Sequence, residues 1–370
     1  MEKIFQKIIL FGLVVYIISA TSSTSGQAIG VIIGIIGFIP LLFIKKDEIK
    51  QVPFNLPILC FFLTLILSTI LSEEPGNGLK TINSLIRRIG LYYLVIFGVK
   101  ELKTLNRLIY LLIISASILA IYVFLQYSFG FSLFNITFHG EEKSIYGNRA
   151  IGEAVGMILP VALCVFIFSK SFYKRLFFGF SILTLSALLL LTTTRGAYLH
   201  VIIATIALGI IKYKKALFFI PVFIILTFLF PMTKGRIIKT LDLDYPNNAY
   251  RICMWKEGLE TIKKYPLFGI GPGCFKAKFN GDVSVHCYNN LLNIAAEGGL
   301  ISLFVYILLL SSIFCYLFKN LNNDPLKIGI LASLIGWFFY GMVDLTYMGR
   351  LGYLFWFLVG CFVVLKRNEG

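Results

Sequence analysis

The sequence predicts an all-α polytopic membrane protein with about twelve transmembrane helices and one larger extracytoplasmic loop, and three observations support this class. Of the 370 residues, 58% are hydrophobic and 14% are charged, whereas a soluble domain carries about 25% charged residues. Apolar runs close to the length of about 20 residues that crosses a bilayer recur along the chain. These runs are continuous and lack the alternating period of a β-barrel. We therefore expect residues 1–370 to form a single integral membrane domain.

Twelve apolar runs mark the expected spans. They cover residues 4–20, 27–44, 53–71, 82–99, 108–127, 151–168, 177–193, 197–211, 216–232, 299–318, 326–343 and 351–366. Every second connection is basic, whereas the connections at 20–26 and 72–80 are nearly free of basic residues. By the positive-inside rule, both termini are then cytoplasmic and the long polar insert at 233–287 is extracytoplasmic. A cleaved signal peptide over residues 1–20 is an alternative that leaves the side of the insert unchanged.

The net charge of +16 is explained by these short basic connections, so we expect membrane lipids and no nucleic acid among the partners. The seven cysteines contain no C-x-x-C pair, and we expect neither a metal site nor a cofactor. Three cysteines, Cys253, Cys274 and Cys287, lie in the insert. A disulfide between two of them would leave one over.

Six arginines are exceptions to the basic cytoplasmic pattern, because the predicted topology places them on the outer side. They are Arg87, Arg88, Arg149, Arg195, Arg251 and Arg350. An arginine in or near a membrane is costly and is usually paired or functional. Glu153, Glu297 and Asp344 are the candidate partners in a structural interpretation. In a functional interpretation, several guanidinium groups together suit a diphosphate, because each binds phosphate oxygens in a bidentate manner.

The two interpretations remain open for Arg87, Arg88 and Arg350, whereas the insert favours the anion site for Arg251. A helix is predicted from about 249 to 264, capped by Asn247 or Asn248 and ended before Pro266. Its apolar stripe predicts a helix that lies on the membrane surface. The stripe consists of Ile252, Trp255, Leu259 and Ile262. Arg251 borders this stripe and is expected to reach toward the spans.

A glycine-rich turn and a histidine follow this helix. Residues 269–273 read G-I-G-P-G, which suits a phosphate cradle or a tight turn, and the absence of a following Lys-Ser/Thr favours the turn. Of the three histidines, His139 fits a solvated loop and His200 fits a packed span. His286 lies at the membrane surface where a helix begins, so it is the candidate proton acceptor. Asn289 is expected to share its helical face.

Four local patterns carry a resemblance to a known family. They are Y-G-N-R-A at 146–150, T-T-T-R-G-A at 192–197, R-I-C-M-W at 251–255 with P-L-F-G-I-G-P-G-C-F at 266–275, and H-C-Y-N at 286–289 with A-E-G-G-L at 296–300. In this order and on one face, they resemble the O-antigen ligase and O-antigen polymerase superfamily of bacterial membrane glycosyltransferases. The resemblance covers about residues 146–310, and the first four spans match only in hydropathy. Two departures are Arg149-Ala150, where Pro-Asn is usual, and Cys287-Tyr288, where a second histidine is common.

The resemblance implies a C-type glycosyltransferase-like fold and a metal-independent transfer at the outer face of the bacterial inner membrane. The donor would be an oligosaccharide on undecaprenyl diphosphate, with Arg195 and Arg251 on the diphosphate and His286 as the base. The acceptor would be lipid A core for a ligase or another lipid-linked repeat for a polymerase, and a chain-length regulator is a further expected partner. The sequence does not distinguish ligase from polymerase. The expected substrate-binding neighbours are Arg149, Arg87, Arg88, Tyr288, Asn289 and Arg350.

Two other classes of function remain as alternatives. A secondary transporter, or a flippase for an anionic or lipid-linked substrate, also commonly has twelve spans, but transporters show paired halves and charges near the middle of the bilayer. Residues 1–185 and 186–370 show no such repeat, and the exceptional charges lie near the outer ends of the spans. A lipid-binding or assembly subunit would keep the arginines and tolerate the loss of His286.

Overall fold

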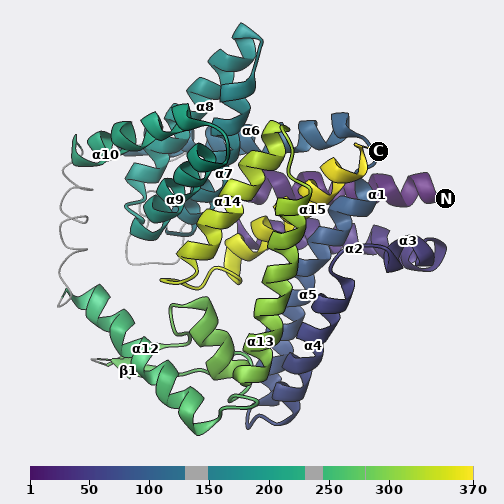
Figure 1. The fold of residues 1–370 in the computed structure, drawn as a ribbon, viewed down its shortest axis with the longest axis vertical. Coiled ribbons are helices and arrows are strands. Elements are labelled where there is room, and N and C mark those ends of the chain that lie inside the picture. The colour runs from purple at the N-terminus through teal and green to yellow at the C-terminus, as the bar shows by residue number, and fades with distance from the viewer. Residues whose placement is uncertain (130–148, 230–244, 280, 370) are drawn as a thin grey trace.

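The computed structural model describes residues 1–129, 149–229, 245–279 and 281–369, and these residues are mainly helical (Figure 1). The first half contains α1 (Glu2–Ser19), α2 (Thr24–Ile44), α3 (Lys46–Lys50), α4 (Asn55–Ile70), α5 (Pro75–Gly98), α6 (Leu102–Phe129), α7 (Arg149–Phe168) and α8 (Phe172–Leu191). The second half contains α9 (Arg195–Ile211), the 3₁₀ turn η1 (Lys214–Phe218), α10 (Phe219–Leu229), α12 (Pro246–Lys264), α13 (Asn290–Lys319), α14 (Pro325–Tyr340) and α15 (Gly349–Arg367). A short hairpin joins β1 (Ala277–Phe279) to β2 (Asp282–Ser284).

The expected spans all overlap helices, within the part of the chain that the structure describes. Six described helices are long and apolar enough to cross a bilayer, namely α2, α6, α7, α8, α13 and α15. Three shorter apolar helices are α4, α9 and α14. The all-α multi-pass membrane class is therefore confirmed, whereas the number of twelve spans stays a prediction. Residues 230–232 of the ninth expected span and 233–244 of the insert lie outside the described residues.

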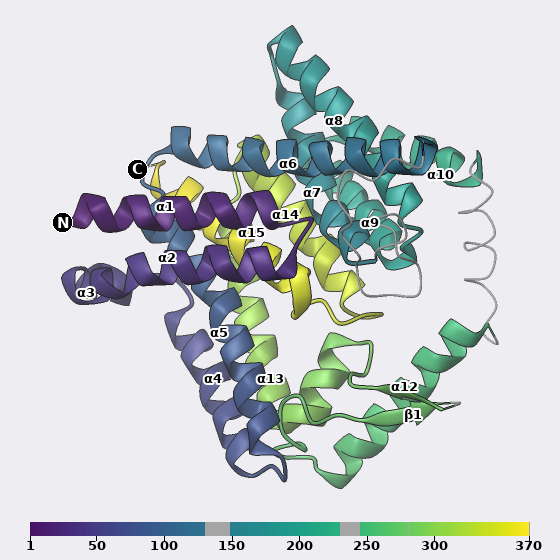
Figure 2. The same ribbon diagram turned by 180° about the vertical axis from the view of Figure 1, so that it is seen from behind.

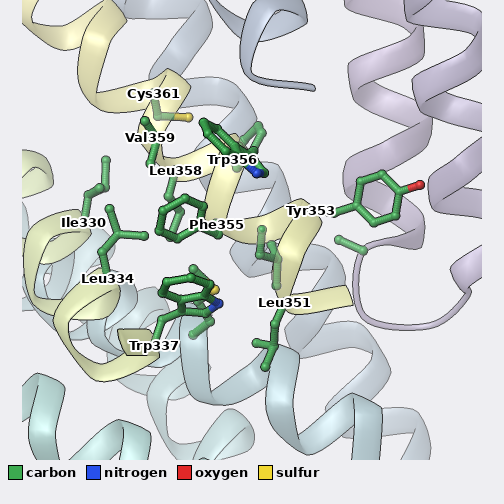
Figure 3. Close-up of a cluster of buried hydrophobic side chains, with 14 of the residues drawn as sticks. Ile330, Leu334, Trp337, Leu351, Tyr353, Phe355, Trp356, Leu358, Val359 and Cys361 are labelled. Carbon is green, nitrogen blue, oxygen red and sulfur yellow. The ribbon is translucent and has the colours of Figure 1, made fainter. Parts of the chain in front are cut away.

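The helix α15 forms the centre of the fold. Its residues from Arg350 to Leu365 are all buried, and it packs against α5, α7 and α14. Figure 3 shows aromatic side chains between α14 and α15. The ring centroids of Trp337 from α14 and Phe355 from α15 are 4.1 Å apart. The Trp337 indole donates a hydrogen bond to the carbonyl of Thr346, 3.1 Å away. This bond fixes the 341–348 loop, which carries part of the site described below.

Small residues allow other helices to approach closely, as is common where lipid replaces water around a protein. The helices α1 and α2 lie side by side (Figure 2). A Cβ atom added at Gly12 would lie 2.5 Å from the backbone nitrogen of Gly34, so only glycine fits this crossing.

The turn between α12 and the hairpin is built into the start of α13. The backbone N–H groups of Ile270 and Gly271 donate to the carbonyls of Ala296 and Glu297, at 3.1 and 2.8 Å. The Glu297 carboxylate faces the backbone of Gly273 and Phe275, so it pairs with this turn and not with an arginine. The glycine-rich segment is thus a structural turn, as favoured from sequence.

A bend at Gly299 completes this junction. Gly299 has φ 77° and ψ 174°, a conformation that is essentially restricted to glycine. An added Cβ would lie 2.0 Å from the carbonyl oxygen of Leu267. The bend therefore lets the 265–273 turn lie against α13.

We predict that Gly299→Ala lowers the thermal unfolding midpoint in detergent much more than Gly281→Ala. Gly281 also has a positive φ, of 91°, but an added Cβ there meets nothing within 4 Å. The control therefore carries only the backbone strain, of about 1–3 kcal/mol, whereas Gly299→Ala adds the clash with Leu267. Equal midpoints for the two variants would show that the bend at Gly299 is not needed.

The helix of the insert, α12, begins at Pro246, slightly before the expected start at 249, and ends at Lys264 as expected. The expected cap at Asn247 or Asn248 was wrong, because the N-cap is Tyr245 and proline occupies the first turn. Its expected apolar stripe is partly wrong. The buried face contains Met254 and Gly258, and Leu259 is 48% exposed. The reason is that α12 packs on the start of α13 and on the hairpin, where Gly258 leaves room for the thiol of Cys287. Cys253, Cys274 and Cys287 are all free thiols.

Candidate functional site

The centre of the candidate site is Asp344, a buried carboxylate shared by two arginines. The Asp344 side chain is 4% exposed and accepts from Arg251 at 3.2 Å. Arg149, the first residue of α7, contacts the same oxygen and also pairs with Glu153 at 2.9 Å. The two guanidinium groups come from α7 and α12, and their side chains remain 45% and 23% exposed. The carboxylate therefore fixes both cations while leaving them accessible to a ligand.

Tyr340 connects the carboxylates at this site. Its hydroxyl lies 2.9 Å from Glu153 and 3.4 Å from Asp344. The start of α9 fits closely against the same ring, because a Cβ at Gly196 would lie 2.0 Å from a Tyr340 ring carbon. This contact explains the glycine after Arg195 and brings the T-T-T-R-G-A turn to the site. Arg195 itself lies over the ring of Tyr245, with 5.7 Å between its Cζ and the ring centroid.

The ring of Tyr288 joins the arginines to the histidine. Its centroid lies 5.9 Å from Cζ of Arg149, 5.7 Å from Cζ of Arg251 and 4.4 Å from the ring of His286. An aromatic face attracts cations at such distances. Tyr288 has a φ of 52°, which is uncommon for a residue with a side chain. Its carbonyl accepts from the Trp255 indole at 3.3 Å, so α12 holds this turn in place.

The electrostatics of the site favour an anionic ligand. Burial lowers the pKa of the Arg251 guanidinium, and the positive charges of Arg149 and Arg195 lower it further. Burial and the charge of Arg149 also lower the pKa of His286 to about 4, so its imidazole is neutral at pH 7. Despite its burial, Arg149 has a raised pKa because of Tyr340 and Glu153, so the uncompensated repulsion falls on Arg251, and an anion beside Arg251 would relieve it.

Asn289 does not share a helical face with His286, and that expectation was wrong. Asn289 is the N-cap of α13, with extended backbone, and its side-chain oxygen accepts from the N–H groups of Leu291 and Leu292 at 2.9 and 3.1 Å. Its amide donates to the carbonyl of Met342 at 2.8 Å. The left-handed turn at Tyr288 separates the two side chains, so Asn289 anchors the start of α13 to the loop that carries Asp344.

Arg88 and Arg350 hold backbone carbonyls. Arg88 donates to Ser84 at 2.6 Å and to Gly349 at 3.2 Å, while Arg350 donates to Thr21 at 2.6 Å and to Ser22 at 3.2 Å. Both side chains are buried and tie distant segments together, which is the structural interpretation. Arg87 is half-buried, and its Nε has no hydrogen-bond partner among the described residues.

From the sequence, Glu153 and Asp344 are predicted only as partners for arginines, and no pattern singles out Tyr340 or Tyr245. The pairing of Asp344 with Arg251 joins residues 93 positions apart, so spacing along the chain gives no signal for it. Residues 146–148, the first part of the Y-G-N-R-A pattern, lie outside the described residues.

The region that carries Arg195, Arg251, His286 and Tyr288 has a family match. Residues 180–307 match the O-antigen ligase family. The predicted resemblance to the O-antigen ligase and polymerase superfamily is confirmed over this region. The chain is also 25% identical to an uncharacterized protein of Haemophilus influenzae, with 90% of each chain covered.

The O-antigen ligase match supports a ligase or polymerase type of activity, with a lipid-linked glycan donor and a glycan acceptor in general terms. Arg149 and Asp344 lie on either side of the matched region. The structure therefore completes the site with one residue from α7 and one from the loop after α14.

Proposed function

We propose that this protein transfers an oligosaccharide from undecaprenyl diphosphate to a hydroxyl group of a glycan acceptor, as an O-antigen ligase or polymerase. The observation that carries the proposal is the pair Arg149 and Arg251, fixed on Asp344 and joined by Tyr288 to a neutral His286. Such a pair suits the two phosphate groups of the donor, and the family match supports the class of reaction.

In this reaction the acceptor oxygen attacks the anomeric carbon of the donor sugar, and the bond to the diphosphate oxygen breaks. Arg251 and Arg149, assisted by Arg195, stabilise the negative charge that develops on the leaving diphosphate. His286 accepts the proton of the acceptor hydroxyl. Asp344 keeps the two guanidinium groups in place, so they need little rearrangement during the reaction. No step requires a metal ion.

The basic connections and the positions of the termini support the proposed side of the membrane. Glu2 pairs with Lys100 at 2.9 Å, and Arg367 donates to the carbonyl of Ile96 at 2.9 Å, so both ends of the chain lie against the end of α5. In Figure 1, α12 lies at the lower left, away from the two ends of the chain at the upper right. We propose that the termini are cytoplasmic and that the site faces the outside of the inner membrane.

The direct test of this activity is mass analysis of the products that purified protein forms from a defined undecaprenyl-diphosphate oligosaccharide. One reaction contains lipid A core as the acceptor, and the other contains only the lipid-linked repeat. We expect a product larger by one oligosaccharide in one of the two reactions, which also distinguishes ligase from polymerase. The same donor recovered unchanged in both would refute the proposed transfer.

The pKa of His286 predicts an unusual pH profile. The pH dependence of kcat/KM reports the pKa values of the free enzyme. The acid side of that profile should therefore have a midpoint near 4, because burial and Arg149 lower the pKa of His286 to about 4. A free imidazole would give a midpoint of about 6.5. Removing the positive charge with Arg149→Gln should move that midpoint upward. A midpoint near that of free imidazole, unchanged by Arg149→Gln, would show that His286 is not the titrating base.

A further inference from the structure

The imidazole of His286, the proposed base, has no hydrogen bond with any residue that the structure describes, and only the backbone of His286 is bonded. Its N–H donates to the Ser284 hydroxyl at 3.3 Å, and its carbonyl accepts from the same hydroxyl at 2.8 Å. In a catalytic triad, by contrast, a carboxylate holds the second ring nitrogen of the histidine. Among the described residues, the position of this imidazole therefore depends on its packing against Tyr288 and on the backbone of residues 284–289, the histidine segment.

Asn293, near the start of α13, holds the backbone directly beside His286. The N–H of Cys287 donates to Oδ1 of Asn293 at 3.0 Å. Both residues are buried, with 0% of Cys287 and 2% of Asn293 exposed. A buried N–H group is costly to leave without an acceptor. This bond therefore fixes the backbone one residue away from the imidazole.

The side-chain nitrogen of Asn293 has partners of its own, and they determine which way the amide points. Nδ2 donates to the Tyr347 hydroxyl at 2.9 Å, and the amide also faces the carboxylate of Glu297, one turn further along α13. One side of an amide donates and the other accepts, so Oδ1 points to Cys287 when Nδ2 faces these two oxygens. Tyr347 lies on the loop that carries Asp344, and Asn293 thus joins the histidine segment to the arginine site.

Asn290, one turn earlier on α13, is equally buried but has different partners. It is 2% exposed, and its amide group exchanges two hydrogen bonds with Thr346, at 2.7 and 2.8 Å. These bonds tie α13 to the same loop. Of the two buried asparagines, Asn293 is the one whose side chain is bonded to the histidine segment, within the part of the chain that the structure describes.

We propose that Asn293 is a positioning residue for the transfer reaction, because its side-chain oxygen holds the backbone beside His286 and so sets where the imidazole meets the acceptor hydroxyl. This inference rests on the proposed function for the role of His286 as the base. Without the bond the imidazole can shift, and a misplacement of about 1 Å can lower a rate about 10²-fold. Donor binding should change little, because Asp344 still holds Arg149 and Arg251.

The test compares three variants of the full chain in lipid nanodiscs. Asn293→Ala removes the acceptor of the Cys287 N–H, whereas Asn293→Asp keeps an oxygen at the same place. Tyr347→Phe is the matched control, because it removes the other bond of Asn293 and leaves the bond to Cys287. Hydrogen–deuterium exchange of the peptide that covers residues 284–289 measures how firmly the histidine segment is held. Steady-state transfer with a defined lipid-diphosphate donor gives kcat and the KM for the donor.

We expect Asn293→Ala to take up deuterium faster in the histidine segment and to lower kcat about 10²-fold, with a nearly unchanged KM for the donor. Asn293→Asp and Tyr347→Phe should resemble the wild type in both measurements. Uptake at the wild-type rate in Asn293→Ala, or a loss of kcat in Asn293→Asp as large as in Asn293→Ala, would overturn the assignment.

The exchange measurement needs no substrate, so it separates this inference from the proposed function. Faster uptake in Asn293→Ala together with no transfer by the wild type would refute the proposed function and still support the bond to Cys287. Normal transfer by Asn293→Ala would refute only the positioning role of Asn293.

Discussion

Replacing His286 with Ala is expected to lower kcat for glycan transfer by about 10²- to 10⁴-fold, the range that a positioned proton acceptor contributes. Binding of the donor should change little, because the imidazole is neutral at pH 7 and takes no part in holding the diphosphate. Steady-state transfer with a defined lipid-diphosphate donor measures the first quantity, and direct donor binding measures the second.

A second variant separates the loss of the base from a loss of packing, because the His286 ring lies 4.4 Å from that of Tyr288. His286→Phe keeps an aromatic ring against Tyr288 but cannot accept a proton, so it should be as slow as His286→Ala. Added imidazole should partly restore His286→Ala. A phenylalanine variant with wild-type turnover would exclude His286 as the base.

Replacing Arg251 with Ala is expected to lower kcat/KM by about 10²- to 10³-fold, as for the loss of one group that stabilises developing charge. The loss should appear in donor binding as well as in kcat, because the guanidinium contacts the diphosphate before and during bond cleavage. It also removes one of the two arginines that pair with Asp344 among the described residues. Steady-state kinetics at varied donor concentration, at a fixed acceptor concentration, distinguish the two contributions.

Two further variants calibrate this effect. Arg251→Lys keeps the charge but loses bidentate geometry, so its activity should be intermediate. Lys256→Ala removes an exposed charge from the same helix, α12, and should leave kcat/KM unchanged. If Lys256→Ala and Arg251→Ala reduced the rate equally, the effect of Arg251 would be one of general surface charge and not of a specific contact.

The positions of the apolar helices could be predicted from sequence, because hydropathy reports directly which segments leave water. The end of α12 before Pro266 and the turn at 269–273 could also be predicted, since proline and glycine have strong local preferences. The buried face of α12 could not be predicted, because it packs against Cys287 and the start of α13 and not against a flat bilayer surface. Local sequence carries no information about such partners.

The same distinction holds within the site. A functional role for Arg251 and His286 could be inferred from residue type and from the family resemblance, but the buried Asp344 that joins Arg149 to Arg251 depends on tertiary packing. The anion-site interpretation was also open for Arg88 and Arg350 in the sequence, yet their guanidinium groups hold backbone carbonyls. Tyr288 reaches the arginines and the histidine because its backbone is left-handed, and this conformation could not be predicted from the residues around it.

The most direct test of the arginine site compares the affinity of the protein for undecaprenyl diphosphate and undecaprenyl monophosphate, which differ only in the second phosphate. The site formed by Arg149 and Arg251 predicts a clear preference for the diphosphate in the wild type and a much smaller preference in Arg251→Ala. Equal affinity of the wild type for both lipids, or a preference that survives Arg251→Ala unchanged, would contradict it.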